Sequence, residues 1–420
     1  MALVVQKFGG TSVGTIERIR SVANWALDCQ AKGDDIVLVT SAMSGETNRL
    51  VDLANQINPI PYSREYDMLI ASGEQIAVGL VSLAINTEAM RRGLIQEGGH
   101  ASRPLLGHQI GIRTDSVYSK ARIQAIDTTL LRKEIARKVI PVIAGFQGVD
   151  TENNITTLGR GGSDTSAVAI AAALNADDCE IYTDVDGVYT TDPRLCKEAR
   201  KIKRISYEEM MELASLGAKV LQIRSVELAA KYKLPLHVRS SFSPVEGTRV
   251  VSQELLGQEM EQVVVAGVAA DPNQVKFTLQ NLPDIPGVAA RVFGALSAAA
   301  IVVDIIVQDA PSSGNITLSF TVGKTDFLKS RQVLESVGAQ SYHGMRVVEE
   351  QDLAKVSIVG VGMQNHPGVA SKMFALLAEA DINIRLVTTS EIKVSCLIAG
   401  AEVKKAVECL HRGFELHRVE

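Results

Sequence analysis

The sequence predicts an α/β protein in which a mainly parallel sheet, sandwiched by helices, is followed by two βαββαβ units. Strands and helices alternate over the first 250 residues, and this alternation favours a parallel sheet with helices on both faces. Several of these strands end in glycine-rich turns that lead into helices. The remaining 170 residues contain an internal repeat instead. We expect three domains, at residues 1–250, 263–345 and 346–420.

Composition limits the partners and the location. The net charge of −5, the absence of a basic block and an aromatic content of 4% argue against nucleic acid as a partner. No apolar run approaches the roughly 18 residues of a membrane span, and the N-terminus lacks the pattern of a signal peptide. The five cysteines are scattered and form no CxxC pair, which predicts a reducing cytoplasm and no zinc site.

The first strand, Ala2–Phe8, ends in the turn KFGGTSVG and is followed by a helix over residues 15–32. Lys7 stands at the strand's end, beside Gly9 and Gly10. The turn is not a Walker A loop, because its lysine precedes the glycines. Such a turn would place the Lys7 ammonium group beside a ligand bound at the two glycines. The alternative, if the turn is taken alone, is that Lys7 is an ordinary solvated side chain.

The run Ile36–Val39 predicts a buried strand, so that Ser41 and Thr47 fall in the loop at its carboxyl end. Ligands of open α/β sheets bind at this end of the strands. A helix over residues 64–86 then carries Glu74 directly after Gly73. The glycine weakens the helix locally, which suggests a close approach there. The alternative is that Glu74 is an ordinary solvated side chain.

Three more elements continue the alternation. We expect strands at Leu94–Gln96 and Val139–Ile143, separated by an amphipathic helix over residues 118–137.

The stretch TLGRGGSDTSA (157–167) has the clearest features of a binding site. Within the six residues 160–165 it combines Arg160, two glycines, two hydroxyls and Asp164, and it runs directly into a helix of small apolar residues. Glycines permit close approach of the backbone, and a helix N-terminus attracts an anion. Arg160 adds a guanidinium group that fits a carboxylate or a phosphate. The alternative is an ordinary turn in which Ser163 or Asp164 caps the helix.

The segment CEIYTDVDGVYTTDPR (179–194) again ends a strand with a polar loop. Asp184, Asp186 and Asp192 would repel a phosphate unless a cation intervened, so Mg²⁺ is the natural partner. Ribose hydroxyls or simple turn formation would explain the same acids. A helix over 207–216, Lys219 as a further cation, and a strand at Pro235–Arg239 complete this part, which ends near residue 250.

In the C-terminal part, two segments align 81 residues apart. Eight identities relate them, beginning with Pro286 and Gly287, which recur as Pro367 and Gly368. Each copy predicts a βαββαβ unit whose PG turn opens a helix that could hold a small zwitterion. Residues 263–270 predict a strand beyond those that two βαββαβ units require, so one copy could be completed by a non-contiguous strand. The last strand of the second unit, near Phe414–Val419, is doubtful.

The motifs KFGGTSV, VTSAMSGETN, ASGEQ, GRGGSDTSA and TDVDGVYTTDPR, in this order, resemble those of the aspartate kinase family, and the tail resembles its paired ACT domains. The resemblance covers essentially the whole chain. It implies an amino-acid-kinase fold followed by ferredoxin-like ACT domains. It also implies transfer of the γ-phosphoryl group of ATP to the β-carboxylate of L-aspartate, at the start of lysine, threonine and methionine biosynthesis.

The resemblance also implies roles for individual residues. Lys7 and Asp164 match the catalytic pair. The residues that would hold aspartate are Ser41, Thr47, Glu74 and Arg160. The nucleotide-binding positions would be Gly9, Gly10, Thr183, Asp184, Tyr189, Arg194 and Lys219.

The expected chemistry agrees with these residue types. Phosphoryl transfer needs positioning and neutralisation of oxygen charge, and a carboxylate is already a nucleophile at neutral pH. Lys7, the glycine-turn amides, a helix N-terminus and Mg²⁺ would together offset the repulsion between aspartate and ATP. No protein ligand of the metal can be assigned directly.

Two other functions share these features. A glutamate or acetylglutamate kinase would have the same fold, lysine and glycine turns, although the ASGEQ stretch and the ACT pair favour aspartate. A non-catalytic amino-acid sensor would be expected to have lost Lys7, Asp164 or Arg160, and all three are present.

The tail resembles that of relatives that lysine and threonine inhibit together. By this resemblance Gly287, Ala289 and Gln308 line a threonine site, while Asp284 and Ser390 border a lysine site. Asp284, Asp304 and Gln308 would take the effector's ammonium group or side chain. The alternative is that the two units only mediate dimerisation.

Assembly is the last expectation. Met260 precedes the regulatory part and resembles an internal start site, which would give a hetero-tetramer of long and short chains. An ordinary linker methionine and a homo-oligomer are the alternative.

Overall fold

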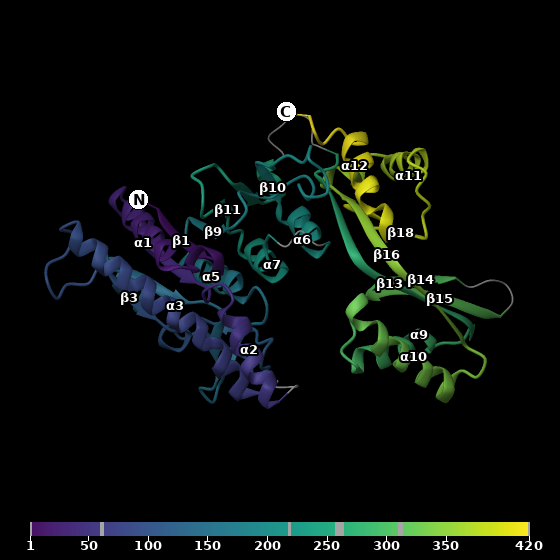
Figure 1. Cartoon of the computed structure of the whole chain (residues 1–420), viewed down its shortest axis with the longest axis horizontal. Helices are drawn as coiled ribbons and strands as arrows, with labels where there is room; N and C mark the ends of the chain where they lie inside the picture. Colours follow the sequence, from purple (N-terminus) through teal and green to yellow (C-terminus); the bar gives the residue numbers. More distant parts are fainter. Residues whose placement is uncertain (1, 59–62, 217–219, 257–263, 310–313, 419–420) are drawn as a thin grey trace. The chain divides into compact units, whose positions relative to one another are not determined.

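The computed structural model describes residues 2–58, 63–216, 220–256, 264–309 and 314–418. They fall into two compact units (Figure 1). The first unit contains residues 1–189 and 201–262, and the second contains 190–200 and 263–420. Segment 190–200, which the sequence placed in the first domain, therefore groups with the C-terminal part of the chain.

An eight-stranded sheet in the order β10-β12-β11-β9-β1-β2-β6-β3 forms the centre of the first unit. All of its strand pairs are parallel except β11 with β12, which confirms the predicted mainly parallel sheet. Its strands are β1 (Leu3–Phe8), β2 (Asp35–Thr40), β3 (Ser102–Leu105), β6 (Ile140–Ala144), β9 (Asp178–Thr183), β10 (Arg204–Ser206), β11 (Leu236–Ser240) and β12 (Thr248–Val251).

Helices cover both faces of this sheet. Phe8 and Leu38 share a buried cluster with residues of α1 and α3, whereas Lys7, which points the other way, meets α5. The helices are α1 (Ile16–Ala31), α2 (Glu46–Ile57), α3 (Arg64–Arg91), α4 (Thr129–Ala136), α5 (Gly162–Leu174), α6 (Tyr207–Ser215), α7 (Ile223–Tyr232) and α8 (Gln253–Leu256). Short 3₁₀ turns are η1 (Gly10–Val13) and η2 (Gly107–Ile110).

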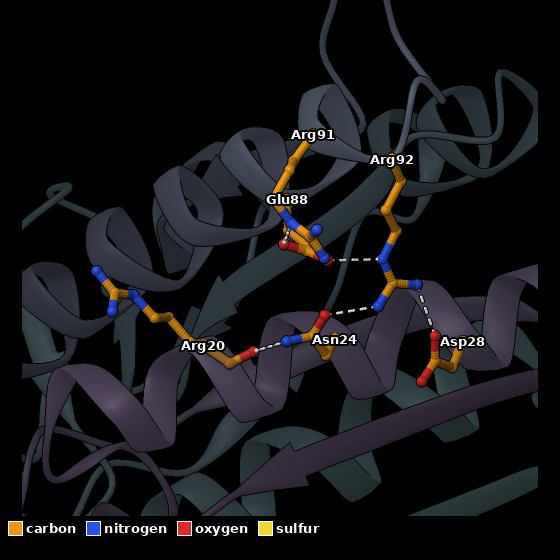
Figure 2. A network of polar contacts seen from close by, with 6 residues as sticks. All are labelled: Arg20, Asn24, Asp28, Glu88, Arg91 and Arg92. Atoms are coloured by element: carbon orange, nitrogen blue, oxygen red, sulfur yellow. Dashed lines mark hydrogen bonds and ion pairs between the residues drawn. The ribbon is translucent and has the colours of Figure 1, made fainter.

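Helix α3 is the longest helix of the first unit. Among the described helices, it alone is long and apolar enough to cross a membrane, but half of that apolar window is buried inside the protein. A polar network also ties its C-terminal end to α1 (Figure 2). There Arg92 donates hydrogen bonds to Glu88 of its own helix and to Asn24 and Asp28 of α1. The helix is therefore a core element of the unit.

Two predictions in this part were wrong. Residues Leu94–Gln96 form no strand; the edge strand is β3, eight residues later. The predicted helix over residues 118–137 is only α4, preceded by β5. Strand β5 belongs to a four-stranded sheet in the order β5-β4-β7-β8, which the sequence analysis missed. Its strands are β4 (Arg113–Thr114), β5 (Ile123–Ala125), β7 (Gln147–Val149) and β8 (Ile155–Thr157).

The second unit contains a single six-stranded antiparallel sheet in the order β14-β15-β13-β16-β18-β17. Its helices lie in two pairs, α9 with α10 and α11 with α12 (Figure 1). The strands are β13 (Gly267–Pro283), β14 (Val303–Asp309), β15 (Asn315–Gly323), β16 (Arg346–Val359), β17 (Leu386–Thr389) and β18 (Lys393–Ala399). The helices are α9 (Val288–Ala298), α10 (Phe327–Ser341), α11 (Val369–Glu379) and α12 (Val403–Gly413), with 3₁₀ turns η3 (Lys324–Asp326), η4 (Val361–Asn365) and η5 (Gly400–Glu402).

The predicted repeat is visible in the backbone. Gly287 and Gly368 both adopt φ +95° immediately before the 11-residue helices α9 and α11. Only glycine takes this left-handed conformation without strain. Both helices are also followed by a left-handed residue, Ala300 in the first copy and Asp381 in the second. The sequence duplication is therefore a structural one.

The two copies share their long central strands. The first part of β13, Gly267–Asp271, pairs with Lys355–Val359 of β16, and its later part pairs with Arg346–Leu353. Each long strand thus crosses from one copy into the other. Residues 414–418, where the sequence suggested a doubtful last strand, form turns, and Val419 lies outside the described residues.

Candidate active site

The polar loops of the first unit meet at one edge of its sheet. Strands β1, β2, β6 and β9 are parallel and in register, with Phe8 beside both Thr40 and Tyr182, and Thr40 beside Ala144. Their carboxyl ends therefore lie together, and the loops that follow them form one surface. This is the place where open α/β sheets bind ligands.

Lys7 and Asp164 form an ion pair on the α5 side of this edge. The Lys7 Nζ atom lies 2.7 Å from the Asp164 Oδ1 atom, and the two residues are only 9% and 8% exposed. Desolvating two charges is costly, so such a pair is seldom kept for stability alone. The structure thus joins the two residues that the sequence analysis named as the catalytic pair.

The turn after β1 approaches the loop after β2 closely. The Gly9 amide donates to the Tyr182 carbonyl oxygen at 3.1 Å, and the Ser44 amide donates to the Gly10 carbonyl oxygen at 3.2 Å. A Cβ atom on Gly10 would lie 2.9 Å from the Ala42 carbonyl oxygen. Position 10 therefore requires glycine if the turn is to keep its place.

The glycine-rich stretch becomes the start of α5. Gly161 adopts φ +70° directly before the helix, and no side chain caps the helix start. The buried hydroxyls of Thr157 and Thr165 have no partner among the described residues. A helix N-terminus without a side-chain cap, with the unpartnered Thr165 hydroxyl in its first turn, suits an anion.

Two residues that the sequence analysis missed hold this stretch in place. Asp67 of α3 is fully buried and accepts hydrogen bonds from the Ser119 amide, the Ser119 hydroxyl and the Thr157 amide. Arg224 of α7 donates to the carbonyl oxygens of Leu158 and Ala121. In the sequence each appears only as a charged residue on a helix, and such side chains usually face solvent.

Glu74 lies on α3 with its carboxyl group near the β2 loop. The Ala42 amide donates to Oε1 at 3.2 Å, and Oε2 is buried without a partner in the described structure. Burial raises the pKa of Glu74 to about 7, and the hydrogen bond from Ala42 only partly opposes this effect. Gly73 leaves room for the approach, because a Cβ there would lie 3.0 Å from the Ala42 side chain. A buried carboxyl group with one oxygen atom free of partners in the described structure is suited to a cationic ligand.

The other residues expected to hold aspartate are more accessible. Ser41 and Thr47 are half-buried, Ser41 directly after β2 and Thr47 in the first turn of α2. Arg160 is exposed, and its side chain forms no recorded ion pair within the described structure.

The expected nucleotide residues other than Gly9 and Gly10 lie from the end of β9 onward. Thr183 ends β9 and Asp184 follows it, and the Thr183 hydroxyl donates to the Asp184 carboxylate at 3.1 Å. Tyr189 donates to Asp186 at 2.8 Å, and burial followed by this contact raises the pKa of Tyr189 to about 12. Arg194 pairs with Asp192 on segment 190–200 of the second unit. Lys219 lies outside the described residues.

The expected effector residues lie in the second unit. Asp284, Gly287 and Ala289 surround the turn that opens α9, and Gln308 is exposed on β14. Ser390 follows β17 of the other copy and is also exposed. Asp304 differs from the expectation, because the buried Lys355 ammonium group already occupies its carboxylate. It is therefore not available to an effector's ammonium group in this conformation.

Comparisons with known proteins agree with this arrangement. Residues 2–240 match the amino acid kinase family, and residues 280–337 and 356–414 match the ACT domain. An aspartokinase of Pseudomonas aeruginosa is 49% identical over 416 residues, which cover 99% of this chain and 98% of that protein. An aspartokinase of Helicobacter pylori is 47% identical over 416 residues, with 99% of each chain covered.

Solved structures show the same likeness. Aspartokinase III of E. coli, in complex with aspartate and ADP, matches 98% of this chain and 99% of its own with a TM-score of 0.78 at 27% identity. The same enzyme in complex with lysine and aspartate matches the same shares of both chains with a TM-score of 0.76, also at 27% identity.

Proposed function

This chain belongs to the amino acid kinase family and is an aspartate kinase with ACT domains, and from that premise we propose which side chains carry its reaction. The enzyme transfers the γ-phosphoryl group of ATP to the β-carboxylate of L-aspartate. Relatives matched along the full length are named as aspartate kinases, so a glutamate or acetylglutamate kinase and a non-catalytic sensor are set aside.

Lys7 and Asp164 form the catalytic pair in this proposal. The single observation that supports it best is their almost fully buried ion pair at the carboxyl edge of the sheet. The Lys7 ammonium group would follow the transferring phosphoryl oxygens, where negative charge is spread in the transition state. Asp164 would orient that ammonium group until the substrates arrive. No general base is needed, because the β-carboxylate of aspartate is ionised at neutral pH.

Glu74 and Arg160 would hold the two charged ends of the aspartate head group. The Glu74 carboxyl group, whose Oε2 atom has no partner in the described structure, suits the α-ammonium group. The Arg160 guanidinium, which is exposed and forms no ion pair among the described residues, suits the α-carboxylate. Ser41 and Thr47 would add hydrogen bonds from the loop after β2. This set would direct the β-carboxylate toward the glycine turn.

ATP would bind across the turn at Gly9 and Gly10 and the loop after β9. The glycines of the turn permit close approach of the phosphates, and the N-terminus of α5 suits their negative charge. Thr183, Asp184 and Tyr189 line the start of that loop. Arg194 and Lys219 remain proposed nucleotide contacts, Arg194 from segment 190–200.

The donor set of the β9 loop fits Mg²⁺. Mg²⁺ prefers carboxylate and phosphate oxygens and is commonly held by one or two carboxylates. Asp186 accepts from Tyr189 and Lys201, whereas Asp184 accepts only from its neighbour Thr183 among the described residues. Asp184 would therefore hold the ion together with ATP, and the ion would supply neutralisation of phosphate charge.

The ACT units would bind amino-acid effectors, namely lysine and threonine. Gly287, Ala289 and Gln308 are the proposed threonine contacts, and Asp284 and Ser390 the proposed lysine contacts. The match of two segments to the ACT domain supports regulation of this kind. The exposed α9 turn offers amide donors for a carboxylate.

Assembly and location complete the proposal. We infer a cytoplasmic enzyme, in keeping with five cysteines that are all free. We also propose a short subunit that starts at Met260, a residue outside the described part of the chain, and hence a hetero-tetramer in place of a homo-oligomer. Mass spectrometry of protein made from the native gene tests it, and the absence of a fragment starting at Met260 would rule it out.

A substrate panel tests the function as a whole. In a hydroxamate assay with ATP, the enzyme should phosphorylate aspartate and ignore glutamate and acetylglutamate. The Asp164→Asn variant should lose this activity while its melting temperature shows that it is folded. Equal activity toward aspartate and glutamate would contradict the proposed selectivity of the site.

A further inference from the structure

Segment 190–200 is firmly built into the second unit. The Val268 amide donates to the Thr190 carbonyl oxygen at 2.7 Å, which fixes the start of the segment beside β13. Cys196 belongs to the buried cluster under α11 and α12. Arg200 donates to the Leu416 carbonyl oxygen at 2.8 Å, so the segment also meets the chain that follows α12.

A histidine of α12 faces this segment with one nitrogen unused. His411 is fully buried, and its Nε2 atom lies 2.8 Å from the Thr190 hydroxyl. Its Nδ1 atom has no partner among the described residues. Leaving a buried polar atom unpaired costs free energy, so a missing partner is expected there.

Two further side chains complete a set of possible ligands. Potential ligand atoms of Glu198, His411 and His417 all lie within 4.8 Å of one another. Glu198 and His417 are exposed, so an ion could reach them from solvent.

We propose that Glu198, His411 and His417 bind a divalent transition-metal ion, for which Zn²⁺ is the best match. Two imidazoles, one carboxylate and a water molecule make a common four-coordinate Zn²⁺ site. In such sites the second nitrogen of a ligating histidine is held by another group, as Thr190 holds Nε2 of His411. The sequence argument against zinc considered only cysteine pairs.

Binding requires a small rearrangement. Zn²⁺ bonds of about 2.0–2.2 Å place tetrahedral ligand atoms roughly 3.3–3.6 Å apart, so three groups within 4.8 Å of one another need to close by at most about 1.5 Å. Only Glu198 and His417 need to move, and both are exposed. Glu198 must also give up Arg412, which binds it through two hydrogen bonds of 2.9 and 2.8 Å. The Arg412 side chain is 62% exposed, so it can return to water at low cost.

A second group of potential metal ligands lies in the first unit, and its side chains cannot rearrange in the same way. There the Asp178 and Glu180 carboxylates lie near His237, but Arg249 and Arg239 already hold one carboxylate each. Arg239 also lies over the rings of Trp25 and Tyr182, which keep it in place. We therefore expect one Zn²⁺ site in each chain.

The test is Zn²⁺ binding by the full-length, metal-stripped enzyme without nucleotide. Titration against a chromophoric chelator should show one tight site per chain, and Co²⁺ should give the visible spectrum of tetrahedral coordination. His417→Ala and Glu198→Gln should each weaken binding by about tenfold or more. Arg412→Ala should tighten it, because the substitution frees the Glu198 carboxylate.

His343→Ala is the matched control, because His343 is exposed and lies outside the cluster. This variant should bind Zn²⁺ as the wild type does. Melting temperatures measured with and without Zn²⁺ give a second readout, and only proteins with an intact cluster should gain stability. A wild type that takes up no Zn²⁺, or equal binding by the His417→Ala and His343→Ala variants, would overturn the proposal.

Discussion

Substitution of Lys7 distinguishes a role in the phosphoryl-transfer step from a role in substrate binding. Its ammonium group is paired with Asp164 before the substrates bind, and its charge matters most when the phosphoryl group is in transit. We expect Lys7→Ala to lower kcat by about 10²–10³-fold, as loss of a single transition-state donor does. The KM for aspartate should change little. Steady-state kinetics with both substrates measure this.

Lys133→Ala provides the control, since Lys133 is an exposed lysine of α4 away from the sheet's carboxyl edge. It should leave both constants unchanged. If Lys7→Ala kept a normal kcat and raised only the KM for ATP, Lys7 would be a nucleotide contact and not a catalytic residue.

The raised pKa of Glu74 should make the stability of the folded protein depend on pH. Its pKa, raised from 4.5 to about 7, means that the folded, substrate-free protein keeps a proton that the unfolded chain releases. Between these two pH values stability should therefore fall as pH rises, by about 3 kcal/mol in total from this one group. Glu74→Gln should remove this slope. Denaturant unfolding at several pH values measures it.

Aspartate binding should respond to the same proton in the opposite sense. The substrate's ammonium group needs the ionised carboxylate, so the KM for aspartate should fall as pH rises through about 7. In Glu74→Gln the KM should be high at every pH, while the KM for ATP stays near normal. A wild-type KM for aspartate that is flat from pH 6 to 8 would show that Glu74 does not meet the ammonium group.

The limits of sequence reasoning at this scale follow from distance along the chain. Lys7 and Asp164 were found because each stands in a local glycine-rich pattern at a strand or helix end. Asp67 and Arg224 were not, because they act on backbone groups up to 103 residues away. The local sequence around a charged residue on a helix does not show whether its side chain is buried and bonded to distant backbone groups or is exposed to solvent.

At the scale of elements, Arg92 connects the ends of α1 and α3 (Figure 2). Its side chain is 25% exposed and has partners on both helices. Arg92→Ala should lower the melting temperature by about 2–4 °C and leave kcat unchanged, because the network is far from the glycine turns along both helices. Differential scanning calorimetry measures the shift.

Arg91 is the matched control for that network. It neighbours Arg92 but, within the described part of the chain, pairs only with Glu88, and its side chain is 72% exposed. Arg91→Ala should therefore shift the melting temperature less than Arg92→Ala does. Equal shifts for the two variants would mean that the cross-helix contacts contribute nothing measurable.

Elements with a long repeating pattern were the predictable ones. The runs in β1, β2 and β9 are buried and six residues long, so their strands were found. The strands of the four-stranded sheet have only two or three residues, too few to show alternation. The error over residues 118–137 has the same origin, because the three-residue strand β5 interrupts what looked like one amphipathic helix.

At the scale of the whole molecule, the expected property is inhibition by two ligands. If lysine and threonine each favour one closed arrangement, together they should inhibit far more than the product of their separate effects. Gln308→Ala and Ser390→Phe should stay active and lose this inhibition, since both positions are exposed and outside the catalytic unit. Dose–response curves with each ligand alone and with both measure it.

Lys355→Met adds a second test of regulation. Lys355 is buried on β16 and neutralises Asp304 of β14. Its loss frees the Asp304 carboxylate, so sensitivity to an amino-acid effector should change while basal activity does not. A wild-type enzyme that is indifferent to millimolar lysine and threonine together would refute regulation by these two amino acids.

The two long strands of the second unit limit how this regulatory part can be rearranged. Because β13 and β16 each pass through both copies, cutting the chain between the copies would leave each half with an unpaired strand edge. Neither half is then a portable module, although the sequence duplication makes each look like one. Grafting this regulation onto another enzyme would require transfer of the whole tail, together with its partner segment 190–200. The two copies are therefore inseparable in engineering terms, and the tail can be exchanged or removed only as a whole.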